Sequence, residues 1–153
     1  MKDRFEKFSY FITETAKHLH RIEQSEMESL DLKGPYAIYL LAIARYKDGI
    51  TAARLSEECA RDKADVSRAV KAMEDKGLLE RSSSVKRGYR APIKLTELGK
   101  RAAKQLEAKA RAAVEFANVN VPSEDLKIFY KTLEALLKNI RTMSKMGVPD
   151  AED

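Results

Sequence analysis

Basic side chains are concentrated in the middle third of this 153-residue chain, where they could bind an anionic partner. Residues 61–101 hold 12 basic and 6 acidic residues, a balance of +6, whereas the rest of the chain has a balance of −1. A surface with this charge attracts polyanions such as nucleic acids. Charge alone also fits a solvated surface without a partner, so the motifs within the window must distinguish the two interpretations.

One segment of this window predicts a helix with an apolar face and a cationic face. Val66, Val70 and Met73 are spaced to share a buried side, and small and basic residues alternate on the opposite side. Small side chains allow close approach to a DNA groove, and cations pair with phosphate and guanine. An exposed face with ordinary ion pairs is the alternative interpretation. The candidate DNA-binding residues of this segment are Lys63, Ala64, Asp65, Ser67, Arg68 and Lys71.

A polar stretch at residues 83–90 combines three cations with one aromatic side chain. A loop of this composition can reach the minor groove or flanking phosphates, with Arg87 as the first candidate for its tip. A loop that serves only solubility is the alternative. The candidate DNA-binding residues of the loop are Lys86, Arg87, Tyr89 and Arg90.

Two short helices and a hairpin must position these residues. Thr51 and Asp62 can cap the two helices, and Gly77 can end the second one. Residues 78–82 and 91–95 predict two strands around the polar loop, and Pro92 implies that the second strand lies at a sheet edge. Two short helices followed by a basic hairpin is the order of elements in a winged helix-turn-helix.

Amphipathic helices are predicted on both sides of this lobe. Residues 5–22 and 122–143 carry apolar stripes at helical spacing, residues 35–46 are apolar nearly all round, and a helix from 97 to 118 is rich in alanine. These apolar stripes must be buried from water, either against a second copy of the chain or within a single-chain helical bundle. Assuming a dimer, the candidate interface residues are Phe5, Phe8, Ile12, Leu126, Phe129, Leu133, Leu136 and Ile140.

The predicted fold class is therefore mainly α with a small β-hairpin wing (α+β), a winged helix-turn-helix flanked by long dimerisation helices. We expect an N-terminal dimerisation helix at 1–33 and a DNA-binding lobe at 34–98. We expect C-terminal dimerisation helices at 99–147 and a disordered tail at 148–153.

Other features of the sequence argue against several classes of protein. The single cysteine, Cys59, excludes an internal disulfide and is interpreted as a small buried hydrophobe rather than a thiol sensor. The charged N-terminus does not resemble a signal peptide, and no apolar stretch approaches the ~20 residues of a membrane span, so a cytoplasmic location is expected. No glycine-rich phosphate loop, metal cluster or activated nucleophile is recognisable, so we expect no enzyme, metal or cofactor.

Four motifs, in this order and spacing, resemble the MarR family of bacterial transcription regulators. They are Gly49-Ile50-Thr51-Ala52-Ala53-Arg54-Leu55-Ser56, Asp65-Val66-Ser67-Arg68, Lys76-Gly77-Leu78-Leu79-Glu80-Arg81 and Tyr89-Arg90-Ala91-Pro92-Ile93-Lys94-Leu95-Thr96-Glu97-Leu98-Gly99. The resemblance implies an obligate homodimer in which the first, fifth and sixth helices of each subunit interlock. Two recognition helices about one duplex turn apart would then read a pseudo-palindromic operator.

The resemblance also implies control by a small ligand, often an anionic aromatic, in a crevice between the dimerisation helices and the DNA-binding lobe. The candidate lining residues are His18, Arg21, Tyr36 and Tyr39, although tyrosines on an apolar helix are also typical core residues. The predicted function is that of a sequence-specific regulator of double-stranded DNA, acting as a ligand-responsive repressor. A winged helix used only for protein contacts is the alternative.

Overall fold

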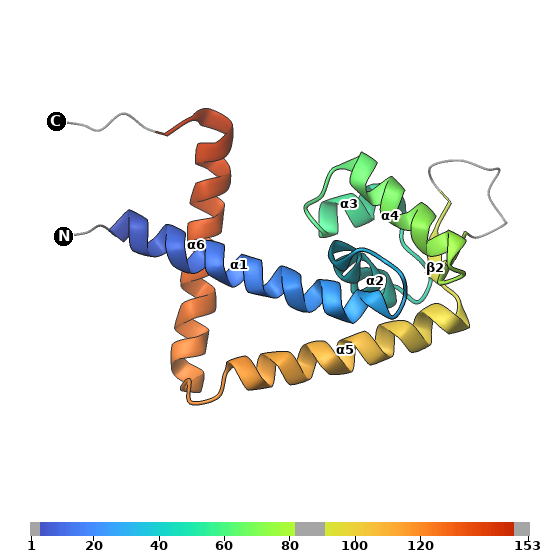
Figure 1. Ribbon diagram of the computed structural model, residues 1–153. Coiled ribbons are helices and arrows are strands. Elements are labelled where there is room, and N and C mark those ends of the chain that lie inside the picture. Colours follow the sequence, from blue (N-terminus) through green and yellow to red (C-terminus); the bar gives the residue numbers. More distant parts are fainter. Residues whose placement is uncertain (1–3, 82–90, 149–153) are drawn as a thin grey trace. The chain divides into compact units, whose positions relative to one another are not determined.

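The computed structural model describes residues 4–81 and 91–148, which belong to two compact units (Figure 1). The first unit spans Met1–Arg111, and the second spans Ala112–Asp153. The described residues are mostly helical and include one two-stranded antiparallel sheet, which confirms the predicted fold class.

The first unit contains every element of the predicted winged helix. The apolar segment expected as one helix over residues 35–46 begins with a single 3₁₀ turn at Pro35 and continues as an α-helix only to Ala44. The elements are α1 (Arg4–Glu28), η1 (Gly34–Tyr36), α2 (Ala37–Ala44), α3 (Ala52–Glu58), α4 (Lys63–Asp75), β1 (Leu79–Arg81), β2 (Ile93–Leu95) and α5 (Glu97–Ala117), whose last turns lie in the second unit.

Side-chain caps fix where α3 and α4 begin. The Thr51 hydroxyl accepts the N–H of Arg54 at 3.3 Å, and the Asp62 carboxylate accepts the N–H of Asp65 at 2.8 Å. Each cap satisfies a backbone donor that has no partner within the helix, an effect worth about 1 kcal/mol. Gly77 follows α4 with a φ of +69°, a conformation that costs glycine little. Both predicted caps and the predicted helix end are confirmed.

The hairpin strands are short, and β2 has backbone partners on both sides. Arg81 of β1 lies opposite Ile93 of β2. On the other side of β2, Ile50 exchanges two backbone hydrogen bonds with Ile93, of 3.0 and 2.9 Å. The strand β2 therefore lies at the edge of a two-stranded sheet, as Pro92 predicted, and an isolated bridge joins Ile93 to Ile50 on its outer side. Pro92 lies just before the strand, so its missing N–H interrupts no pairing.

One hydrophobic core joins all elements of the first unit except the exposed part of α1. The apolar face of α4 packs there against α2, α3 and the hairpin, and α5 adds three residues of its first turns. Burial of this face fixes which side of α4 points outward, because the remaining positions of the helix are left to solvent. The fully or almost fully buried side chains include Met27, Tyr39, Leu40, Ile43, Ile50, Leu55, Val66, Val70, Met73, Leu78 and Ile93.

The second unit consists of the end of α5 and the helix α6 (Ser123–Met146). None of the α6 residues is buried, although the helix carries an apolar stripe. An apolar stripe that stays exposed among the described residues is typical of an interaction surface. Among the described residues, no helix has the length and apolar character needed to cross a bilayer.

Candidate nucleic-acid interface

The exposed face of α4 carries the DNA-binding candidates that the structure describes. Val66, Val70 and Met73 are fully buried, as predicted, and thereby direct the opposite side of the helix to solvent. Five of the six candidates are exposed, and Asp65 is partly buried. The face thus presents cations that are interspersed with small side chains, the arrangement that a major groove accepts. The exposed residues are Lys63, Ala64, Ser67, Arg68 and Lys71.

A hydrogen bond at the start of α4 links this face to the core. The Tyr39 hydroxyl on α2 donates to Oδ2 of Asp65 at 2.5 Å, and Oδ1 of Asp65 lies 3.5 Å from an Nη atom of Arg68. Burial, and next the hydrogen bond to Asp65, raise the pKa of Tyr39 well above its ordinary value. The phenol therefore stays protonated and remains the donor at neutral pH.

An ion pair joins the hairpin to α4. Nε of Arg81, at the end of β1, lies 2.7 Å from Oε1 of Glu74 on α4. Both side chains are partly exposed, so the pair adds orientation more than stability. The candidates that belong to the wing loop lie outside the described residues, and their DNA role stays a prediction: Lys86, Arg87, Tyr89 and Arg90.

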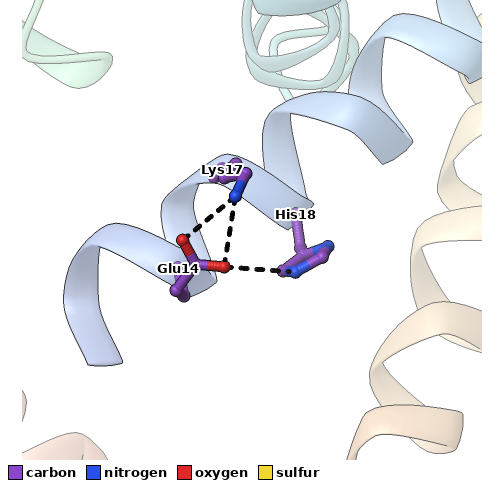
Figure 2. Close-up of polar contacts among 3 residues, drawn as sticks. All are labelled: Glu14, Lys17 and His18. Atoms are coloured by element: carbon purple, nitrogen blue, oxygen red, sulfur yellow. Dashed lines mark hydrogen bonds and ion pairs between the residues drawn. The ribbon is translucent and has the colours of Figure 1, made fainter. Parts of the chain in front are cut away.

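The four candidates for a ligand crevice fall into two pairs. Tyr36 and Tyr39 are buried with ring centroids 6.2 Å apart. His18 and Arg21 are exposed on α1, and Figure 2 shows His18 beside Glu14, with Nε2 3.7 Å from Oε2. Lys17 pairs with the same carboxylate at 3.1 Å, so Glu14 already neutralises part of this cationic surface. The ligand role of all four residues stays a prediction.

The candidates for the dimer interface are exposed or only partly buried within the single chain. Phe5 is 74% exposed and Phe129 is 53% exposed, values that leave large apolar surfaces in contact with water. Ile12, Leu136 and Ile140 are exposed as well, whereas Phe8, Leu126 and Leu133 are partly buried. Burial of such surfaces is favourable by roughly 25 cal/mol per Å². The residues therefore have the exposure that a subunit interface requires.

Cys59 lies on the inner face of the first unit, as predicted. Its side chain is buried, and this burial raises the pKa of the thiol above its ordinary value. A buried neutral thiol is a poor nucleophile and a poor metal ligand. In residues 4–81 and 91–148, no group of three or more potential metal ligands occurs.

The spacing of residues along the chain does not predict the link between Tyr39, Asp65 and Arg68. The sequence predicted Asp65 as a DNA-binding candidate, and the family resemblance implied a ligand crevice for Tyr39. The two residues are 26 positions apart, and no local pattern signals a contact over that separation. A polar hydroxyl on a helix that is otherwise almost entirely apolar was the one available hint.

Comparison with known proteins gives one family model that matches part of the chain and many solved structures with the same fold. The family model described as MarR family matches residues 30–88. Among the curated proteins, none matches the sequence of this chain.

Solved structures with the same fold include proteins bound to DNA and to a small molecule. The S. aureus MepR–DNA complex is similar with a TM-score of 0.79 at 17% identity, covering 90% of this chain and 99% of that one. A MarR-family protein of Listeria monocytogenes complexed with 26mer DNA has a TM-score of 0.76 at 21% identity, with coverage of 99% and 100%. CouR from Rhodococcus jostii RHA1, bound to p-coumaroyl-CoA, has a TM-score of 0.73 at 15% identity, with coverage of 89% and 95%. At these identities the likeness establishes the fold.

Proposed function

Because residues 30–88 match the MarR family model and the chain has the fold of MarR-family regulators, we propose that it is a sequence-specific, double-stranded DNA-binding transcription regulator. The observation that carries the proposal is the outward face of α4. There, Lys63, Arg68 and Lys71 are exposed beside Ala64 and Ser67 on a helix whose other face is locked into the core. Arginine can donate two hydrogen bonds to guanine, at O6 and N7, and lysine can neutralise phosphates.

The comparisons support DNA rather than a protein as the partner of this face. Two of the similar structures are DNA complexes of proteins that share the fold over nearly the whole chain. A winged helix used only for protein contacts would not need an exposed row of cations, and no observation on this chain favours that alternative.

We further propose that the regulator acts as a homodimer in the cytoplasm, on a pseudo-palindromic operator. The exposed apolar faces of α1 and α6 support the dimer, since a second copy would remove them from water. Two copies of α4 would then bind two half-sites of the DNA, and the operator would therefore be symmetric.

We propose that the regulator is a repressor and that a small anionic ligand controls its binding to DNA. The fold is shared with CouR, whose structure holds p-coumaroyl-CoA, and this likeness supports a ligand-responsive mechanism. The predicted crevice residues on α1, η1 and α2 include donors and aromatic rings that suit an acid with an apolar body.

Selection of genomic duplex fragments by the purified protein tests the DNA proposal. We expect enrichment of a short pseudo-palindrome, which Arg68→Ala weakens by at least about tenfold because a bidentate base contact is worth about 1–3 kcal/mol. Arg111→Ala is the matched control, since its side chain is similarly exposed, at 70% against 65%, but lies on α5. Enrichment of no sequence, or equal effects of the two substitutions, would contradict the proposal.

A further inference from the structure

Among the described residues, one side-chain hydrogen bond links α2 to α4. Tyr39 is fully buried, and its hydroxyl donates to Oδ2 of Asp65 at 2.5 Å. A buried hydroxyl without a partner would cost about 1–3 kcal/mol, so this contact strongly constrains the position of the Asp65 carboxylate. The N–H of Asp65 is held as well, by the cap residue Asp62 at 2.8 Å.

The second carboxylate oxygen of Asp65 faces the exposed arginine of the same helix. Oδ1 lies 3.5 Å from an Nη atom of Arg68, while 65% of the Arg68 side chain remains exposed. A guanidinium carries five N–H donors, so an interaction at one Nη atom leaves donors free for another partner. Arginine also loses about 2 kcal/mol of rotamer entropy when it is immobilised, and a preformed ion pair reduces the loss that remains on binding.

We propose that Tyr39 is a positioning residue for DNA recognition: its buried hydroxyl holds the Asp65 carboxylate, which in turn orients the Arg68 guanidinium toward a base pair. This inference rests on the proposed DNA-binding function. It assigns Tyr39 a role in sequence readout without contact with DNA. It also explains why an acid is tolerated on a face that approaches phosphates, since the carboxylate is engaged on both sides by protein donors.

Tyr39→Phe tests this role because it removes only the hydroxyl. We expect affinity for the selected duplex to fall by about tenfold, an effect typical of one lost hydrogen bond to a charged group, with affinity for an unrelated duplex unchanged. Tyr46→Phe is the matched control, since the Tyr46 hydroxyl also donates to a carboxylate, that of Glu58 at 2.7 Å, but away from α4. We expect the control variant to bind both duplexes like the wild type.

A double-mutant cycle with Arg68→Ala separates positioning from a merely structural role. If Tyr39 acts through Arg68, Tyr39→Phe should have less than about a twofold further effect in the Arg68→Ala background. A structural role would lower affinity equally in both backgrounds and for both duplexes. The inference would be overturned if Tyr39→Phe lowered the affinity for the selected duplex equally in both backgrounds. It would also be overturned if Tyr39→Phe alone left this affinity unchanged.

Asp65→Asn provides a second route if Tyr39→Phe fails to fold. The amide oxygen can still accept from the Tyr39 hydroxyl, but the charge that faces Arg68 is gone. We expect the same loss of discrimination between the two duplexes with an unchanged melting temperature, and retained discrimination would overturn the inference. Absence of any duplex binding by the wild type would instead refute the proposed function itself.

Discussion

Substitution of Phe129 by alanine should weaken the subunit interface that we propose for the exposed face of α6. Complete burial of a large apolar side chain is worth about 1.5–3 kcal/mol. Phe129 is 53% exposed in the single chain, so about half of that energy, roughly 1 kcal/mol, is still available to a partner. A twofold-symmetric dimer contains the contact twice, which gives about 2 kcal/mol, or a roughly 30-fold higher dissociation constant.

Sedimentation of the protein over a dilution series measures this effect. The wild type should sediment with twice the 17.3 kDa of one chain, and Phe129→Ala should dissociate at a concentration roughly 30-fold higher than the wild type does. Leu98→Ala is the control, because Leu98 is similarly exposed, at 46%, but lies at the start of α5 next to the hairpin.

Two results would refute this reasoning. A wild type that sediments as a monomer at micromolar concentration would mean that a second copy of the chain does not bury the apolar stripe of α6. A Phe129→Ala variant that dissociates like the wild type would place this side chain outside the interface.

Three further predictions concern the first unit. Gly99→Ala should destabilise the fold by more than about 2 kcal/mol in urea unfolding, since a Cβ atom would lie 2.0 Å from the carbonyl oxygen of Leu78. Gly77→Ala, where only the positive φ opposes a side chain, should cost about 1 kcal/mol, and equal losses would contradict the close contact at Gly99. Cys59 should react with iodoacetamide at pH 7.5 at least about tenfold more slowly than it does in urea, because burial covers the thiol and raises its pKa; equal rates would disprove its burial. Asp62→Ala should lower the free energy of unfolding by about 1 kcal/mol through loss of the α4 cap, and no change in urea unfolding would contradict the cap.

Local patterns were sufficient to predict the helices and strands of the winged helix. The caps at Thr51 and Asp62 and the helix end at Gly77 each depend on residues within four positions, so their chemistry can be read along the chain. The same holds for the buried side of α4, where the spacing of Val66 and Met73 determines the exposed face.

Contacts between distant residues could not be predicted in this way. The hydrogen bond from Tyr39 to Asp65 depends on how α2 packs against α4, and the pairing of Ile50 with Ile93 depends on where a loop meets the hairpin. Both depend on tertiary packing, which the spacing of residues along the chain does not encode. For the same reason, sequence predicted which residues of α6 are apolar but not what covers them.

The salt dependence of operator binding tests the central claim most directly. Fluorescence anisotropy with the selected duplex would give the association constant from about 50 to 200 mM salt. If Lys63 and Lys71 of two subunits neutralise phosphates while Arg68 contacts bases, the logarithm of this constant should fall with the logarithm of salt concentration at a slope of about −4. Lys71→Ala should make the slope shallower by about 2, one for each subunit, while Lys104→Ala on α5 leaves it unchanged. A slope near zero, or a Lys71→Ala slope equal to that of the wild type, would contradict DNA binding through this face of α4.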